Sequence, residues 1–172
     1  FDSSRGAQLR IKSDSTSSET TSQGTVTKFL KGGYAVGNQT SVNKSGDSVC
    51  SWNWVANGGT TASNGNGSIS STVQANTTAG FSIVQYTGNR SSGATIGHGL
   101  SQAPEVIITK NLDASYNWII YFKQQGANKY GYLNLTNTWV TDTTGFNNVE
   151  PTSTVFTVGS AYESNGTHSM IA

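Results

Sequence analysis

The fold is decided by the stretch Gly80–Leu112, which contains GFSIVQYTGN (residues 80–89), TIGHGL (95–100) and APEVIITKNL (103–112). Successive side chains of a strand point to opposite faces, and in the first segment apolar side chains occupy both faces. The VII run at residues 106–108 is typical of a strand that is buried on both sides. Gly97-His98-Gly99 predicts a tight turn, since glycine adopts backbone angles closed to most residues. We therefore predict two core strands joined by a turn-rich connection.

Outward from this stretch, the sequence alternates between short apolar segments and polar loops. The loops expected to be longest span residues 13–24 and 38–47, which contain almost no apolar side chains. Further strands are predicted at residues 8–12, 25–30, 34–37, 48–55, 68–74, 117–122, 129–135, 139–140, 155–158 and 169–172. No segment has the periodicity of a helix. The sequence therefore predicts an all-β protein, an antiparallel β-sandwich of jelly-roll or lectin-like type.

The composition and charge of the sequence exclude some classes of function. Only 11% of the 172 residues are charged, and the formal net charge is +1. Neither a nucleic-acid partner nor insertion into a membrane is expected, because basic residues are scattered and no apolar run approaches the roughly 20 residues that span a bilayer. Cys50 is the single cysteine, which excludes an internal disulfide. Cys50, Trp52 and Trp54 share one face of the strand predicted at 48–55, so we expect them in the core.

The sequence contains a partial internal repeat. Three pairs of segments match in order and spacing: GYAVG (33–37) matches VFTVG (155–159), RGA (5–7) matches QGA (125–127), and the strand at 50–52 matches that at 170–172. We therefore predict that residues 1–56 are the C-terminal part of one β unit, that 57–67 form a Gly/Asn/Ser-rich linker or loop, and that 68–172 form a second sandwich lacking its final strand. Because the chain starts at Phe1, it is expected to be a processed product or a piece of a longer polypeptide.

A family resemblance is carried by the segments already quoted between residues 80 and 111, by residues 118–121 and 133–134, and by PTSTVFTVG at 151–159. Together they resemble a repeat domain of bacteriophage structural proteins, similar to tail-fibre and virion-appendage proteins of marine phages and cyanophages. The resemblance implies a location in the virion, on the surface of an extracellular particle. It also implies partners among other copies of the chain and neighbouring virion proteins. It brings no catalytic residues and no cofactor.

His98 is the most conspicuous candidate site residue. It would serve as a metal ligand or receptor contact, or as a turn residue whose ring bonds nearby backbone; we favour the turn, since a metal site needs three or four convergent ligands. The loop at 38–47 has oxygen-bearing side chains around Gly46 and would hold Ca²⁺ or form a solvated turn, which we favour. Aromatic side chains beside amides can stack on sugars. Candidate glycan or receptor contacts are therefore His98, Tyr116, Trp118, Tyr130 and Trp139.

No catalytic motif is present. The nine carboxylates are spread thinly, and there is neither a nucleophile elbow nor a phosphate-binding loop. The first hypothesis is a non-enzymatic virion structural protein, a tail fibre, head fibre or surface appendage that acts in assembly and host-surface attachment, with a host glycan as a possible ligand. The alternative is a carbohydrate-binding module or bacterial surface adhesin. A third hypothesis, a polysaccharide depolymerase fragment, requires a carboxylate pair lining a groove.

Overall fold

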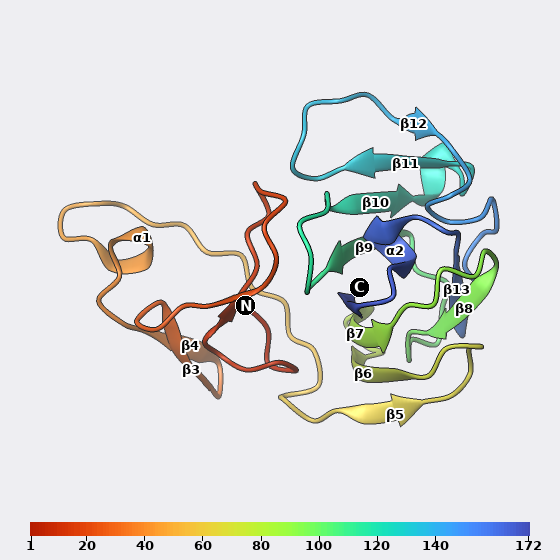
Figure 1. Ribbon diagram of the computed structural model, residues 1–172. Coiled ribbons are helices and arrows are strands. Elements are labelled where there is room, and N and C mark those ends of the chain that lie inside the picture. The colour runs from red at the N-terminus through yellow and green to blue at the C-terminus, as the bar shows by residue number, and fades with distance from the viewer.

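The structure is a computed structural model that describes residues 1–172. It confirms the all-β prediction and consists of a β-sandwich formed by the C-terminal two thirds of the chain and an extended N-terminal region (Figure 1). The sandwich strands are β5 (Ala62–Asn64), β6 (Ser71–Asn76), β7 (Phe81–Thr87), β8 (Ala94–Gly97), β9 (Val106–Asn111), β10 (Ile119–Phe122), β11 (Lys129–Tyr132), β12 (Val140–Thr141), β13 (Val155–Val158) and β14 (Ser169–Ile171).

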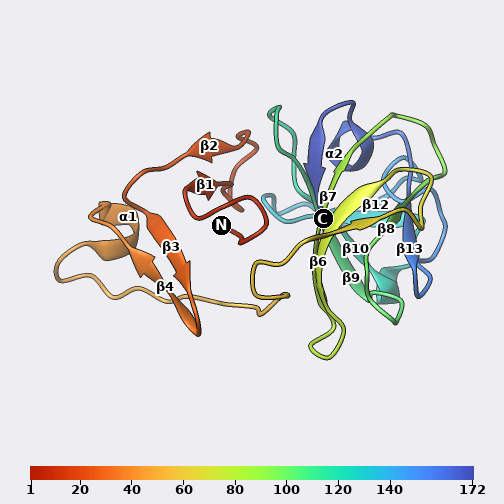
Figure 2. The same ribbon diagram turned by 90° about the horizontal axis from the view of Figure 1, so that it is seen from below.

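Two layers make up the sandwich. One is an eight-stranded antiparallel sheet in the order β12-β11-β10-β9-β14-β7-β6-β5. The other is a two-stranded antiparallel sheet formed by β8 and β13. Figure 2 shows β8 and β13 beside the large sheet, whose inner face they cover. The core between the layers contains Ile96 and Val158 from the small sheet and Val84, Tyr121 and Met170 from the large one. All five are at most 5% exposed, so this layer-to-layer contact supplies most of the apolar burial.

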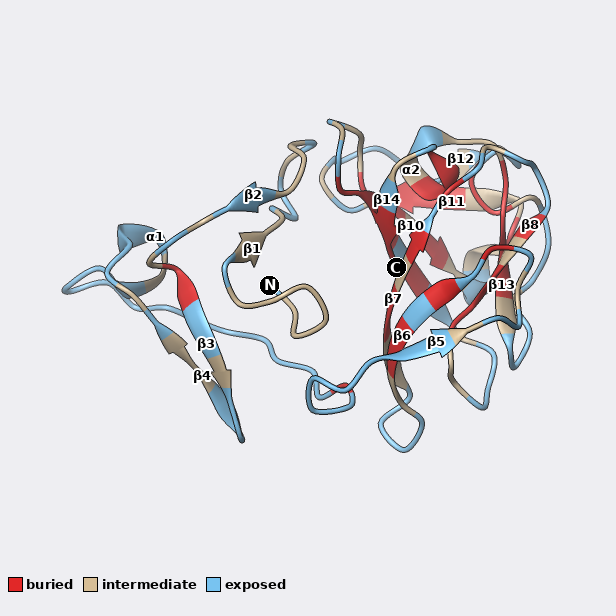
Figure 3. Ribbon diagram, turned by 60° about the horizontal axis from the view of Figure 1, so that its bottom comes forward, coloured by how far each residue is buried: buried red, intermediate tan, exposed pale blue.

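The N-terminal region contains β1 (Leu9–Arg10), β2 (Thr20–Thr21), β3 (Val26–Leu30), β4 (Gly33–Val36) and α1 (Thr40–Asn43). Its first part, to about residue 20, lies against the outer face of the large sheet. There the Lys12 carbonyl accepts a bond from the Trp118 indole (2.8 Å), and Ile11 packs on the cluster of Ile83, Leu112 and Ile171. The rest projects away from the sandwich, and Figure 3 shows how little of it is buried.

Lys110 fixes the N-terminal region to the sheet. Its fully buried ammonium donates to the carbonyl oxygens of Thr16 (3.1 Å), Asn111 (2.9 Å), Ala114 (3.5 Å) and Tyr116 (3.0 Å). Burial lowers the pKa of Lys110 to about 8, so the amine is charged at neutral pH. One buried cation therefore connects the turn after β9 with a loop that lies far away in the sequence.

The N-terminal region and the end of the sandwich make the same backbone pairs. β1 pairs with β2 as β11 pairs with β12: Leu9 lies opposite Thr21 as Lys129 lies opposite Thr141. In the next segment Gly37 donates to the Thr25 carbonyl as Gly159 donates to the Gly145 carbonyl. A Cβ on either glycine would collide with a carbonyl, of Gly24 in the first case and of Thr144 in the second. The echo seen in the sequence thus corresponds to a shared local structure.

The two one-turn α-helices extend this correspondence. Four positions beyond β4 comes α1, and four positions beyond β13 comes α2 (Tyr162–Asn165). The last helical residue is an asparagine in both, and its amide donates to a glycine carbonyl: Asn43 to Gly37 at 2.9 Å, and Asn165 to Gly159 at 2.8 Å. These helices and the 3₁₀ turn η1 (Lys123–Gln125) are the helical elements that the sequence did not predict. None of the helices has the length and apolar character needed to cross a membrane.

Two sequence-based predictions are wrong. Residues 48–55 form no strand, and Trp52 (76% exposed) and Trp54 (69% exposed) lie at the surface with Cys50 instead of in the core. The predicted linker 57–67 contains β5, which pairs with β6 at the edge of the large sheet. Residues 48–55 form no strand because no neighbouring strand covers their apolar side chains. β5 has no large apolar side chains and is held by main-chain pairing.

Candidate functional site

The candidate site is a groove in the large sheet, where β14 ends between β7 and β9. β14 is antiparallel to both neighbours, so β7 and β9 run parallel to each other. Ala172 follows β14 and exchanges both backbone hydrogen bonds with Val84 of β7, each 2.8 Å long. On the other side, Leu112 donates to the Ser169 carbonyl at 2.9 Å. A groove lined by residues of β7 and β9 lies next to this end of β14.

Backbone groups of β7 and β9 face this groove. In an antiparallel ladder, alternate residues direct their N–H and C=O to the same neighbour. Because Val84 bonds Ala172, Ser82 of β7 directs its backbone groups toward the groove; by the same alternation from Leu112, so do Ile108 and Val106 of β9. These groups have no backbone partner there. Backbone groups of both strands therefore border the groove.

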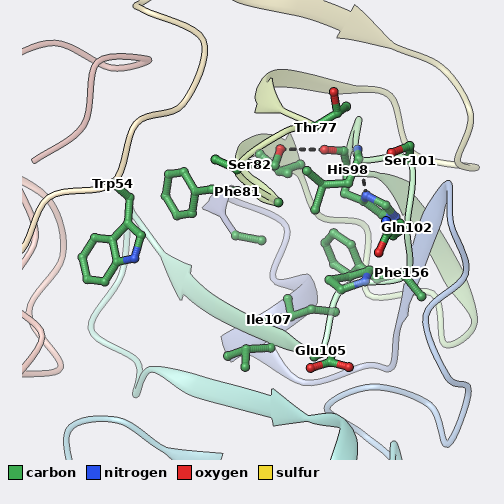
Figure 4. Close-up of a pocket in the computed structure, with 18 of the residues that line it drawn as sticks. Trp54, Thr77, Phe81, Ser82, His98, Ser101, Gln102, Glu105, Ile107 and Phe156 are labelled. Carbon is green, nitrogen blue, oxygen red and sulfur yellow. Dashed lines mark hydrogen bonds between the residues drawn. The ribbon is translucent and has the colours of Figure 1, made fainter.

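The groove has a volume of about 790 Å³ and is mainly apolar. Val84, Ile107 and Phe156 line its inner side, next to His98, whereas Phe81 and Trp54 stand at its outer mouth (Figure 4). Trp54 stacks on Phe81 with ring centroids 6.2 Å apart. The groove therefore has an apolar inner wall and an aromatic mouth.

His98 is held by backbone groups. Its Nε2 donates to the Thr152 carbonyl (3.2 Å), and its Nδ1 accepts from the Leu100 N–H (3.1 Å), which assigns the neutral tautomer protonated on Nε2. Desolvation lowers the pKa of His98, since its side chain is buried. The hydroxyl of Ser82 donates to the His98 carbonyl at 2.6 Å and not to the ring. The two residues therefore do not form a nucleophile–base pair.

Acid is expected to destabilise the protein through His98. Its pKa is 6.5 in the unfolded chain and lower in the folded one, so as pH falls below 6.5 the unfolded state binds the proton first and the free energy of unfolding decreases. One proton gives a slope of at most about 1.4 kcal/mol per pH unit. Urea titrations between pH 7.5 and 4.5 should show this slope for the wild type and a shallower one for His98→Gln. Equal slopes would contradict the assignment.

The aromatic residues expected to contact glycans do not gather in one place. Trp118 and Tyr130 are each 9% exposed and belong to buried regions, and His98 is 3% exposed, so none presents a free ring face. Tyr116 stacks on Tyr162 at a centroid distance of 5.0 Å. Trp139, at 36%, is the exposed member of the set and lies against Phe122 at 6.3 Å. The His98 ring bonds backbone groups, as favoured from the sequence, but the tight turn predicted at residues 97–99 is wrong, because Gly97 ends β8 and residues 98–100 continue without a turn.

Residues 49–55, which we call the donor segment, lie at the surface, although the sequence predicted a core strand there. They are extended and exposed, with Trp52, Trp54, Val49 and Val55 between 60% and 76% accessible. The internal repeat could have pointed to these residues, because it matches Cys50 with Met170 of β14. Met170 is fully buried in the centre of the sheet, while Cys50 is exposed. The donor segment thus has the side chains of a central strand and no sheet around it.

The titratable residues form no cluster of metal ligands. No group of three or more His, Cys, Asp or Glu side chains converges. In the loop at 38–47, Asp47 pairs with Lys44 at 3.2 Å, and the amide nitrogen of Asn43 donates to the Gly37 carbonyl. In the groove, Glu105 is exposed and pairs with Lys123 at 3.2 Å. The groove is therefore mainly apolar, and the carboxylate of Glu105 at its edge is held in a surface ion pair.

A protein-family model described as Domain of unknown function (DUF7483) matches residues 1–172. No curated protein and no solved structure matches the chain.

Proposed function

The chain belongs to the DUF7483 family of domains of unknown function, and from its geometry we propose that it is a non-enzymatic building block of a bacteriophage virion. It would form part of a tail fibre, head fibre or surface appendage, acting in assembly and host-surface attachment. Its partners would be other copies of the chain and neighbouring virion proteins, on the surface of the particle.

The donor segment is the observation that carries this proposal. Trp52, Trp54 and Val55 lie next to one another along the chain and are all exposed, and a contiguous exposed apolar patch often marks an interaction site. An extended segment of this kind is suited to adding a strand to another sheet, where main-chain bonds give affinity and side chains give specificity. A protein that assembles would cover these residues, and a freely soluble enzyme would have no use for them.

The virion setting is supported by the sequence between residues 80 and 159 that resembles phage appendage repeats. The surface chemistry is compatible with it. The Lys123–Glu105 and Lys44–Asp47 pairs are exposed, so they add little stability. The other two ion pairs, of Arg5 with Asp2 and Glu19, involve a buried guanidinium, and salt screens buried pairs much less than surface charges.

A carbohydrate-binding module or surface adhesin is the second candidate, and Trp139 favours it. This side chain is 36% exposed at the β11–β12 edge of the large sheet, with one face on Phe122. An indole placed in this way can stack on a sugar ring.

Concentrating the purified chain should distinguish these functions. We expect ordered assemblies by electron microscopy, and slower reaction of Cys50 with a thiol reagent in the assemblies than in dilute protein, because Cys50 is exposed in the donor segment. A glycan array run on the same protein should be negative. A chain that remains monomeric with a fully reactive thiol and gives glycan hits that Trp139→Ala abolishes would favour the binding module instead.

A further inference from the structure

We propose that Arg90, stacked on the ring of Tyr162, binds the carboxylate of an acidic sugar. Arg90 lies in the connection between β7 and β8, on the sandwich and apart from the donor segment and the groove. The inference gives the attachment part of the proposed function a class of ligand, and the role of the site in attachment rests on that function.

Three side chains from distant segments form a stack. The guanidinium carbon of Arg90 lies 3.7 Å from the centroid of the Tyr162 ring, at the start of α2. The Tyr116 ring is parallel to the Tyr162 ring within 5°, at a centroid distance of 5.0 Å. One ring face has no room for both groups, so Tyr162 lies between Arg90 and Tyr116. A guanidinium stacked on a ring in this way keeps its N–H groups available at its edge.

The backbone at Arg90 is held in a strained conformation. Its φ is 61°, in the left-handed region that a side chain disfavours. Fully buried Asn165 holds it there: the Asn165 carbonyl accepts from the Arg90 N–H (3.0 Å), its side-chain oxygen accepts from the Asn89 N–H (2.8 Å), and its amide donates to the Ser91 carbonyl (3.0 Å). Strain at a residue other than glycine often accompanies function. Glycine would adopt this conformation without that cost, which leaves the side chain as the reason for an arginine here.

The guanidinium of Arg90 has no partner in the protein. The ion pairs of the chain are those of Arg5 with Asp2 and Glu19, of Lys44 with Asp47, and of Lys123 with Glu105. The hydrogen bond that Arg90 donates comes from its backbone N–H. Its side-chain nitrogens are not among the buried atoms without a partner, so they are accessible to solvent. The protein therefore positions a cation that is free to bind an anion.

The surroundings of Arg90 favour an acidic sugar. The guanidinium fork matches a planar carboxylate through two parallel N–H···O bonds. The same loop and the end of α2 expose hydroxyl and amide side chains, which can bond sugar hydroxyls: Thr87, Asn89, Ser91 and Thr167. An acidic protein segment or a nucleic acid would bring several negative charges, but neither this loop nor α2 contains a second Lys or Arg. One cation within a polar rim suits a ring that carries one carboxylate.

NMR titration of the full chain with methyl glucuronide tests the proposal, and methyl glucoside is the matched uncharged probe. We expect the Arg90 Nε–H signal to shift with glucuronide, and glucoside to bind about tenfold more weakly, because it lacks the carboxylate. The methyl glycoside of N-acetylneuraminic acid distinguishes a sialic acid from a uronic acid. A single solvent-facing guanidinium binds in roughly the millimolar range, too weakly to be retained on a glycan array.

Substitutions separate contact with the ligand from stability. Arg90→Gly should abolish glucuronide binding but leave the melting temperature nearly unchanged, because relief of the backbone strain offsets the lost stacking. Arg90→Lys keeps the charge without the fork and should weaken binding about tenfold. Tyr162→Phe keeps the stacked ring and should bind like the wild type, whereas Tyr162→Ala should bind more weakly. Trp139→Ala is the control at the other exposed aromatic site and should change nothing.

Three results would overturn the inference: no shift of the Arg90 signal with glucuronide, equal binding of glucuronide and glucoside, or glucuronide binding that survives Arg90→Gly. Assembly is measured separately by electron microscopy, and Arg90→Gly should assemble like the wild type. If the wild type fails to assemble but binds glucuronide through Arg90, the assembly function is wrong and the sugar site stands. If it assembles and binds neither sugar, the assembly function stands and the sugar site is wrong.

Discussion

Lys110→Met should lower the free energy of unfolding by about 3 kcal/mol, since removal of one partner leaves buried polar groups without hydrogen bonds. The ammonium of Lys110 is fully buried and donates to four carbonyl oxygens, including that of Thr16 in the N-terminal region. Methionine fills a similar volume but donates nothing. The carbonyl of Thr16 would lose the bond that holds its loop against the sheet.

Urea denaturation measures the loss in stability, and hydrogen exchange of residues 9–21 shows whether the N-terminal region loosens. Lys123→Met is the matched control, because Lys123 makes an exposed ion pair with Glu105. Its effect should remain within about 0.5 kcal/mol. Equal effects of the two substitutions would show that the buried ammonium contributes no more than a surface charge.

Asn165→Ala should also cost about 3 kcal/mol, whereas Asn43→Ala should cost less than about 1 kcal/mol, although both amides make the same bond to a glycine carbonyl. Asn165 is fully buried. Its amide nitrogen donates to Ser91 (3.0 Å) and Gly159 (2.8 Å), and its oxygen accepts from the Asn89 N–H (2.8 Å). Asn43 is exposed, so water replaces its bond to Gly37.

This pair of variants isolates the effect of burial, because the local hydrogen bond and the one-turn helix are common to both sites. Thermal and urea unfolding of the two variants provide the comparison. A large loss at Asn43 would mean that the N-terminal region is covered in solution, and a small loss at Asn165 would mean that the α2 region opens readily.

The segments at 25–30, 34–37, 106–110 and 155–158 form β3, β4, β9 and β13 as predicted, because apolar residues at strand spacing favour strands. Burial on both faces, which the run at 106–108 predicted, is wrong: Val106 is 49% and Ile108 38% exposed, since the second layer covers one face of β9 only. β5 was missed, since Ala62, Ser63 and Asn64 have no apolar pattern and are held by pairing with β6. The sequence of a short segment does not show which other strand its main chain pairs with.

The failure at residues 48–55 has a different cause. Alternation identifies side chains that suit a core, but burial requires neighbouring strands, and those of β14 come from β7 and β9, far away in the sequence. The groove was also beyond prediction, because it is formed where three distant strands meet. By contrast, the contact of the His98 ring with the Leu100 N–H is local and agrees with the sequence-based prediction, whereas its contact with the Thr152 carbonyl depends on a distant segment.

The position of β14 has a consequence for synthesis of the protein on the ribosome. β7 and β9 are neighbours of β14 in space, yet both leave the ribosome well before it does. Until β14 emerges, the nascent chain has two unpaired strand edges and an open apolar layer, and such edges invite pairing with other chains. Closure of the sheet depends on contacts of long sequence separation, which fold slowly. Nascent chains stalled before residue 169 should therefore bind chaperones, and release should follow once the last strand is available.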